Sequence, residues 1–200
     1  MLGRIRTLLW AVVGIVAVAG IYLVLKPPAP QSQTSNGLPM QTIGGPFTLT
    51  GSDGRPFNSS RLAGKPAAVF FGFTNCPDVC PTTLARLAKL RQQLGKGEDG
   101  FSIVFISVDP ERDRPDDVGR YTALFNTPII GLTGSPAQVE QVKKQFGVYS
   151  AKVPVEGGGY SVDHTATVFL LDRNGSFVAT LSPDEGDSTA LDKLRRIAAA

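Results

Sequence analysis

A run of apolar and small residues at 67–73, Ala-Ala-Val-Phe-Phe-Gly-Phe, places the strongest limit on how this chain can fold. A strand with one face in water alternates apolar and polar side chains, and this segment has no polar side chain for either face. We therefore expect a strand buried on both faces, in a sheet that helices cover from two sides. Such a strand belongs in an α/β domain.

The segments around this strand alternate between helical and extended patterns. In chain order we expect a hairpin from Phe47, the 67–73 strand, a helix through 84–94, a strand at 101–108, a helix at 116–125, a strand at 128–132, a helix at 136–146, paired strands at 166–171 and 176–181, and a last helix from about Ser188. The segment around Gly157–Gly159 reads as a loop. This order predicts a mixed sheet with helices on both faces, the layout of thioredoxin-like domains in their peroxiredoxin-like variant.

The N-terminal segment predicts export. Residues 8–25 carry no charge, while Arg4 and Arg6 precede them and Lys26 follows. We expect residues 1–26 to form one transmembrane helix with a cytoplasmic N-terminus, by the positive-inside bias. A cleaved signal peptide is the alternative, because Ala17-Val18-Ala19 is an A-x-A site. No long, acid-poor presequence precedes the span, which favours the bacterial inner membrane, with the functional domain on the periplasmic side.

Residues 27–42 are rich in Pro, Gln, Ser and Thr, which predicts a flexible linker before a domain at 43–200. The net charge of +3 comes from the N-terminal segment, because removing Arg4, Arg6 and Lys26 leaves 17 Lys and Arg against 17 Asp and Glu. A near-neutral exported domain disfavours a nucleic-acid partner. The chain also lacks the Walker, Rossmann and Gly-x-Ser-x-Gly motifs in the required context, which excludes nucleotide chemistry and triad hydrolysis.

The chain has only two cysteines, in Cys76-Pro77-Asp78-Val79-Cys80, between the buried strand and a helix start. At this spacing the two Cβ atoms share one helix face about 5 to 6 Å apart, so both sulfurs can reach one metal or each other. We expect the helix N-terminus to lower the thiol pKa. A purely structural disulfide is the alternative, but closing so short a loop contributes only roughly 2 kcal/mol.

His164 is the only histidine. In a thioredoxin-like fold the strand from Ala166 lies beside the strand that leads to Cys76, so the loop before it brings His164 close to the cysteines. Two thiolates and one imidazole suit copper, whereas a structural zinc site needs a fourth protein ligand. We therefore predict that Cys76, Cys80 and His164 are the metal ligands and that the cysteines are also a redox-active pair.

Three aspartates are candidates for supporting this site. Asp109 ends the 101–108 strand, at the sheet edge where sites gather, and it could orient the metal site or a partner; a turn or helix cap is the alternative. Asp78, midway between the two cysteines, and Asp163, just before His164, are further candidates. The rest of the charged segment 109–115 is expected to be a solvated loop.

Five segments together resemble one family. They are 43–47 (Ile-Gly-Gly-Pro-Phe), 71–81 (Phe-Gly-Phe-Thr-Asn-Cys-Pro-Asp-Val-Cys-Pro), 105–113 (Phe-Ile-Ser-Val-Asp-Pro-Glu-Arg-Asp), 131–134 (Gly-Leu-Thr-Gly) and 162–164 (Val-Asp-His). They are similar to the Sco/SenC copper chaperones of cytochrome c oxidase assembly. The resemblance implies that Cys76, Cys80 and His164 bind one copper, as Cu(I) or Cu(II), and that the partner is the CuA site of oxidase subunit II. A periplasmic copper donor or thiol reductant is a further expected partner.

We expect copper transfer by ligand exchange, an activity of a metallochaperone rather than an enzyme. A thiol–disulfide oxidoreductase that reduces the oxidase copper-site cysteines is the first alternative, and it needs the cysteine pair but not His164. Oxidoreductases of the thioredoxin type have two residues between their cysteines, whereas this chain has three. A copper or redox sensor that uses the same residues is the second alternative.

Overall fold

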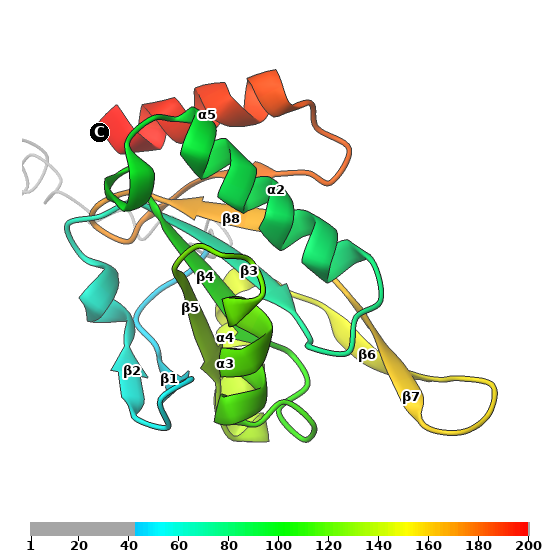
Figure 1. Cartoon of the computed structure of the whole chain (residues 1–200). Coiled ribbons are helices and arrows are strands. Elements are labelled where there is room, and N and C mark those ends of the chain that lie inside the picture. Colours follow the sequence, from blue (N-terminus) through cyan, green and yellow to red (C-terminus); the bar gives the residue numbers. More distant parts are fainter. Residues whose placement is uncertain (1–42, 200) are drawn as a thin grey trace, which may run out of the picture. The chain divides into compact units, whose positions relative to one another are not determined.

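The structure is a computed structural model that describes residues 43–199 (Figure 1). Its strands are β1 (Thr48–Gly51), β2 (Pro56–Asn58), β3 (Ala67–Gly72), β4 (Ser102–Ser107), β5 (Ile129–Thr133), β6 (Ser150–Pro154), β7 (Tyr160–His164), β8 (Val168–Leu171) and β9 (Phe177–Leu181). Its helices are α2 (Val79–Gln93), α3 (Pro115–Ala123), α4 (Pro136–Phe146) and α5 (Asp187–Ala199), with short 3-10 turns η1 (Ser59–Leu62) and η2 (Gly97–Asp99).

Seven strands form one mixed sheet in the order β2-β1-β5-β4-β3-β8-β9. Strand β3 is parallel to β4 and antiparallel to β8, and all six of its residues are buried. Helix α4 covers one face of the sheet, while α2 and α3 cover the other, where Cys80 and Tyr121 lie near the strand residue Phe105. The predicted mixed α/β sheet around a doubly buried strand is therefore confirmed.

Aromatic rings fill the core on both faces of β3. On one face, Phe146 of α4 packs against Phe71 and Phe169, with ring centroids 5.3 and 5.4 Å apart. On the other face, Phe105 packs against Phe70 at 6.4 Å and against Tyr121 of α3 at 5.3 Å. Adjacent residues of a strand point to opposite faces, so Phe70 and Phe71 anchor both helix layers.

Helix α4 begins and ends where its sequence predicts. Ser135 accepts a hydrogen bond from the Gln138 amide, and the Gln138 side chain accepts one from the Ser135 amide. Pro136 occupies the first turn, and Gly147 ends the helix in a left-handed conformation (φ 67°). Capping of this kind satisfies backbone groups that the helix ends leave free, so local sequence alone sets these bounds.

The β6–β7 hairpin was not predicted. Residues 150–164 form an antiparallel hairpin, β6–β7, in place of an irregular loop, with Ser150 paired to His164 and Pro154 paired to Tyr160. The glycines at 157–159 all have positive φ and lie in the turn between its strands. The hairpin is a sheet of its own, separate from the main sheet. His164 consequently ends a strand and does not lie in a loop.

The predicted transmembrane helix and linker, residues 1–42, lie outside the described residues. Among the helices of residues 43–199, none combines the length and apolar character that a membrane span requires.

Replacing Phe146 by alanine should destabilise the domain by about 3 to 5 kcal/mol, because the ring is 1% exposed and its removal leaves a cavity between α4 and the sheet. Leu124→Ala is the matched control, since Leu124 is 71% exposed and should change stability by less than about 0.5 kcal/mol. Urea unfolding of both variants measures this difference. Equal stability of the two variants would contradict the packing described here.

Candidate metal centre

The two cysteines lie where β3 gives way to α2. The chain leaves β3 through a turn in which the Cys76 amide donates to the Phe73 carbonyl at 3.2 Å, and Cys80 occupies the first turn of α2. The Cys80 amide donates to Cys76 Sγ at 3.3 Å. Cys80 is fully buried, whereas Cys76 is half-buried. One sulfur is therefore shielded from water and the other is accessible.

Gly72, the last residue of β3, makes room for Cys80. A Cβ atom added at Gly72 would lie 2.7 Å from Cys80 Sγ and 2.9 Å from Cε2 of Phe105. Both distances are too short for real contacts. The sulfur thus rests directly on the sheet backbone, and only glycine permits this approach.

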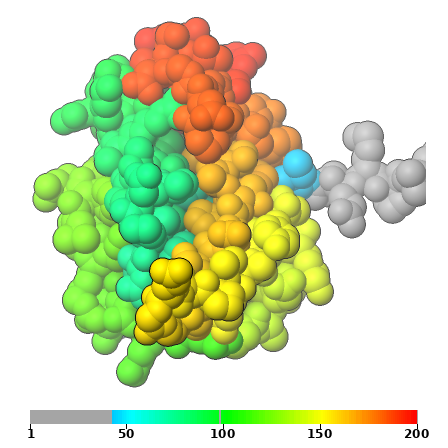
Figure 2. Space-filling view, turned by 90° about the vertical axis from the view of Figure 1, so that its right-hand side faces the viewer, coloured from blue at the N-terminus to red at the C-terminus, as the bar shows by residue number. Residues whose placement is uncertain are grey.

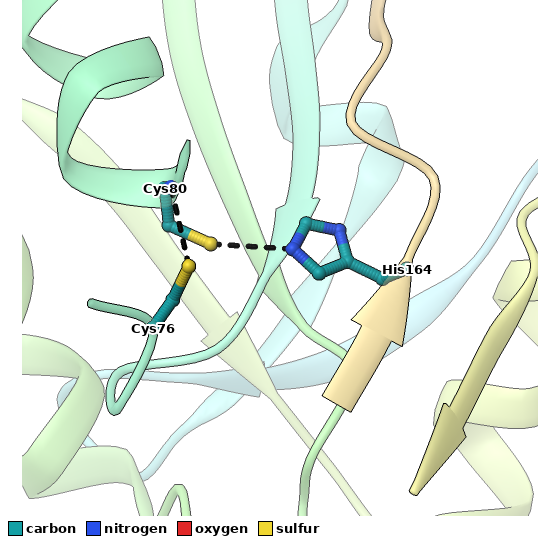
Figure 3. A group of neighbouring side chains, drawn as sticks. All are labelled: Cys76, Cys80 and His164. Atoms are coloured by element: carbon teal, nitrogen blue, oxygen red, sulfur yellow. Dashed lines mark hydrogen bonds between the residues drawn. The ribbon is translucent and has the colours of Figure 1, made fainter. Parts of the chain in front are cut away.

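His164 faces the cysteines from the end of β7, and its Nε2 lies 3.4 Å from Cys80 Sγ (Figure 3). Its Nδ1 lies 3.0 Å from the Thr165 carbonyl oxygen. A carbonyl only accepts, so Nδ1 carries the proton and the Nε2 lone pair points at the sulfur. The rings of Phe70 and Phe73 pack edge-on against the imidazole, at 6.0 and 5.8 Å. The histidine is therefore held in the tautomer and orientation of a ligand.

The structure brings together the three residues that the sequence singled out. One ligand atom from each of Cys76, Cys80 and His164 lies within 4.8 Å of the other two. Metal bonds to sulfur and nitrogen are about 2.0 to 2.3 Å long, so one ion can bridge Cys80 Sγ and His164 Nε2, which lie 3.4 Å apart, with Cys76 close by. The arrangement can bind one soft or borderline metal ion, and the sulfurs are also close enough to exchange with a disulfide.

Burial controls the protonation of this site. It raises the pKa of the Cys80 thiol well above its ordinary value, and the hydrogen bond with Cys76 raises it further. The prediction that the helix N-terminus lowers the thiol pKa is thus wrong for Cys80, because loss of water outweighs the helix dipole. Burial also lowers the pKa of His164. A metal entering the site therefore meets a neutral imidazole and has to displace the Cys80 proton.

The three candidate aspartates have different surroundings. Asp109 is 1% exposed, pairs with Arg112 and accepts a hydrogen bond from the Tyr160 hydroxyl at 2.9 Å. Asp78 is exposed and accepts from the Thr82 hydroxyl at 3.3 Å, and Asp163 is exposed on β7. Within residues 43–199, no hydrogen bond or ion pair joins these aspartates to the cysteines or to His164.

Sequence analysis missed Asp113. It was assigned to a solvated loop, but its side chain is fully buried and accepts hydrogen bonds from the Thr74 amide (2.9 Å), the Thr74 hydroxyl (2.6 Å) and the Ser107 hydroxyl (2.6 Å). Burial raises the pKa of Asp113, although these hydrogen bonds act in the opposite direction. The available signal was Ser107, a polar residue near the end of a strand that is apolar from Ile103 to Ile106, which required a polar partner once buried.

Tyr121 was also missed. Its hydroxyl is buried, with no hydrogen-bond partner in the part of the chain that the structure describes. Burial raises its pKa, and the charges of Cys80 and Cys76 raise it further, so this hydroxyl lies within electrostatic reach of both sulfurs. It is a buried hydroxyl on the α3 side of Phe105, the ring that also lies near Cys80.

Comparisons with known proteins agree on one family. The model of the SCO1/SenC family matches residues 35–199. An SCO2-like protein of Rickettsia conorii is 32% identical over 187 residues, which cover 90% of this chain and 91% of that protein. The structure of Bradyrhizobium japonicum ScoI with copper bound is 42% identical, with a TM-score of 0.70, over 78% of this chain and 99% of that one.

A more distant structure shares the fold alone. BsSco, described as a member of the Sco family of cytochrome c oxidase assembly proteins, is 24% identical with a TM-score of 0.61. The match covers 80% of this chain and 95% of that one.

The reduced, metal-free protein should lose stability as pH rises above about 8.5, the ordinary pKa of a thiol. The unfolded chain gives up the Cys80 proton there while the folded protein keeps it, because the folded pKa is raised. The expected slope is about 1.4 kcal/mol per pH unit in the free energy of unfolding. Denaturant titrations across this range measure it.

Cys80→Ser is the control for this slope, because serine does not titrate there, whereas all other alkaline groups are shared. The two proteins should therefore diverge with rising pH. If the unfolding free energies of the two proteins change in parallel from about pH 8 to pH 10, the Cys80 thiol is not shielded in the folded protein.

Proposed function

This chain belongs to the SCO1/SenC family, and from that membership we propose that it binds one copper ion through Cys76, Cys80 and His164. The observation that carries the proposal is the convergence of the three ligand atoms within 4.8 Å of one another. The copper-bound relative from Bradyrhizobium japonicum, which is 42% identical, supports the choice of metal.

The ligand chemistry favours copper over zinc. Thiolates and imidazole suit copper, which also heads the divalent affinity series. A closed structural zinc site uses four protein ligands, and the only such cluster in residues 43–199 offers three. A set of three also leaves a position open through which a partner's ligand can enter.

Each residue of the site has a distinct part in binding. His164 offers the Nε2 lone pair because its Nδ1 proton is held by the Thr165 carbonyl. Cys76 is the accessible ligand and receives the ion first, while Cys80 gives up its proton only as the ion enters. Release begins at the same accessible ligand, so a partner's thiolate replaces Cys76 before Cys80 and His164 let go.

We propose that the recipient is the CuA site of cytochrome c oxidase subunit II, which makes the protein a metallochaperone. The support is family membership, since the family includes a protein described as a cytochrome c oxidase assembly protein. The proposal places the domain on the periplasmic face of a bacterial inner membrane, held by residues 1–26 and separated from it by the linker at 27–42. The uncharged stretch at 8–25 supports this arrangement.

A thiol–disulfide reductase is the second candidate, and the closeness of the two sulfurs favours it. The Cys76 thiolate would attack a partner disulfide, forming a mixed disulfide and releasing one partner thiolate. The Cys80 thiolate would then attack Cys76 Sγ, forming the internal disulfide and releasing the second thiolate. The partner is reduced by two electrons and this chain is oxidised by two. The reaction makes no use of His164.

The reduced protein should bind one copper ion, and His164→Ala, Cys76→Ser and Cys80→Ser should each weaken binding by more than about 100-fold. Loss of a direct ligand should exceed the about 10- to 100-fold effect of losing an outer partner. Anaerobic titration against a competing chelator gives stoichiometry and affinity. Val178→Ala, on the exposed side of β9, is the control and should bind as the wild type does. Wild-type affinity in His164→Ala would refute the three-ligand site.

Cells that lack this protein should assemble an oxidase without copper in its CuA site, and the wild-type gene should restore the copper. His164→Ala should fail to restore it if the protein delivers copper, and should succeed if the protein acts only as a reductase. Copper content of the purified oxidase measures the outcome. A phenotype that persists in cells without oxidase genes would instead point to a sensor.

A further inference from the structure

We propose that the loop between β4 and α3, residues 109–113, sets the distance between the two halves of the copper site although it supplies no ligand. Asp113 holds the cysteine half, and Asp109 with Arg112 holds the histidine half through Tyr160. This inference rests on the proposed function, and it adds Asp113 and Tyr160 as positioning residues for the site.

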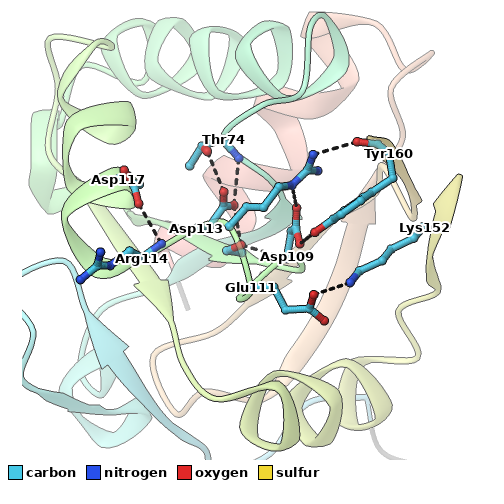
Figure 4. A network of polar contacts seen from close by, with 10 residues as sticks. Thr74, Asp109, Glu111, Asp113, Arg114, Asp117, Lys152 and Tyr160 are labelled. Atoms are coloured by element: carbon cyan, nitrogen blue, oxygen red, sulfur yellow. Dashed lines mark hydrogen bonds and ion pairs between the residues drawn. The ribbon is translucent and has the colours of Figure 1, made fainter. Parts of the chain in front are cut away.

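Asp113 attaches the cysteine half. Thr74 begins the turn that leads to Cys76, and both its amide and its hydroxyl donate to the Asp113 carboxylate. The same carboxylate, shown with Thr74 in Figure 4, also accepts from the Ser107 hydroxyl at the end of β4. Three hydrogen bonds to one fully buried carboxylate therefore tie the cysteine turn to the end of β4.

Tyr160 attaches the histidine half. It begins β7, the strand that His164 ends. Its hydroxyl donates to Asp109, and its carbonyl accepts from Arg112 Nη1 at 2.8 Å. Its ring lies between two cations, with the Arg112 guanidinium carbon 3.8 Å and Lys152 Nζ 4.6 Å from the centroid. Hydrogen bonds and cation–π contacts thus join one residue of the hairpin to the loop.

These contacts position the hairpin together with the buried side chain of Val162 and the packing of His164 on Phe70 and Phe73. It shares no strand pairing with the main sheet, so no backbone ladder fixes β7 relative to β3. A second link between the hairpin and the loop is the ion pair of Lys152 with Glu111, at 2.6 Å. Figure 2 shows the hairpin, in yellow, beside the blue-green surface to which α2 belongs. Cys80 of α2 and His164 of β7 are in contact, with 3.4 Å between Sγ and Nε2. Side chains of the loop therefore control how close this hairpin lies to α2.

Hydrogen bonds within the loop hold its two attachment points, Asp109 and Asp113, in a fixed arrangement. The Asp113 amide donates to the Asp109 carbonyl at 2.9 Å, and the Asp109 amide donates to the Ser107 hydroxyl at 3.0 Å. Both carboxylates are buried, and the charge of Asp109 raises the pKa of Asp113. Burying two neighbouring carboxylates is a poor means of stabilising a fold. It does provide strong, directional acceptors for the two halves of the site.

The test uses variants that keep side-chain shape and remove one bond. Tyr160→Phe keeps the ring and loses the hydroxyl that binds Asp109, while Thr74→Val loses the hydroxyl that binds Asp113. Tyr149→Phe is the matched control, because Tyr149 is 65% exposed, lies beside the same hairpin, and its hydroxyl makes no hydrogen bond within residues 43–199. The copper affinity of each variant is measured in the otherwise wild-type full-length chain and again in the chain that also carries His164→Ala.

Tyr160→Phe should lower copper affinity by about 10-fold in the wild type and should add nothing in the His164→Ala background, because it acts through His164. Thr74→Val should lower affinity by a similar factor in both backgrounds, because it acts through the cysteines. Tyr149→Phe should leave the copper affinity unchanged in both backgrounds. Equal effects of Tyr160→Phe in both backgrounds would overturn the proposal, since they would indicate general destabilisation.

A second readout needs no metal. In the metal-free protein, Tyr160→Phe should shift and broaden the NMR signals of the His164 ring, the only imidazole in the chain. Thr74→Val should instead shift the Cys76 amide signal. Unchanged His164 signals in Tyr160→Phe would overturn the inference even if copper binds. Failure of the wild type to bind copper would refute the proposed function separately.

Discussion

The burial of β3 on both faces is the constraint on which the rest of the structure depends. Because no side chain of this strand can face water, helices must cover the sheet from two sides, and α2 follows directly from its end. The small size of Gly72 then lets the first turn of α2 lie so close that Cys80 Sγ contacts the sheet backbone. The most buried atom of the metal site is thus a consequence of core packing.

This packing gives the site two unlike sulfurs. Burial shields Cys80 and raises its pKa, whereas Cys76 is only half-buried. In the proposed copper site, Cys80 would be the retained ligand and Cys76 the exchangeable one. The imidazole of His164 would need no deprotonation to bind, because burial lowers its pKa.

The polar chemistry beneath the site is concentrated in one short loop. Asp109 and Asp113 are four positions apart, both buried, and their partners lie on opposite halves of the site. Arg112 offsets the charge of Asp109, while Asp113 is satisfied by three donors. Each carboxylate therefore has partners that compensate for its removal from water.

The sequence by itself determined the parts whose information is local. An unbroken apolar run identified β3, and apolar periodicity identified the helix after it. The Ser135-Pro136-Ala137-Gln138 segment defined the start of α4, and the cysteine spacing with a sole histidine singled out the candidate ligands. Tertiary structure alone decided the β6–β7 hairpin, the burial of Asp113 and the direction of the Cys80 pKa shift. The hydrogen bond from Thr74 to Asp113 spans 39 positions, and the contact of Cys80 with His164 spans 84. Burial of a charged or titratable group depends on partners that are distant in the chain, and a local pattern carries no information about them.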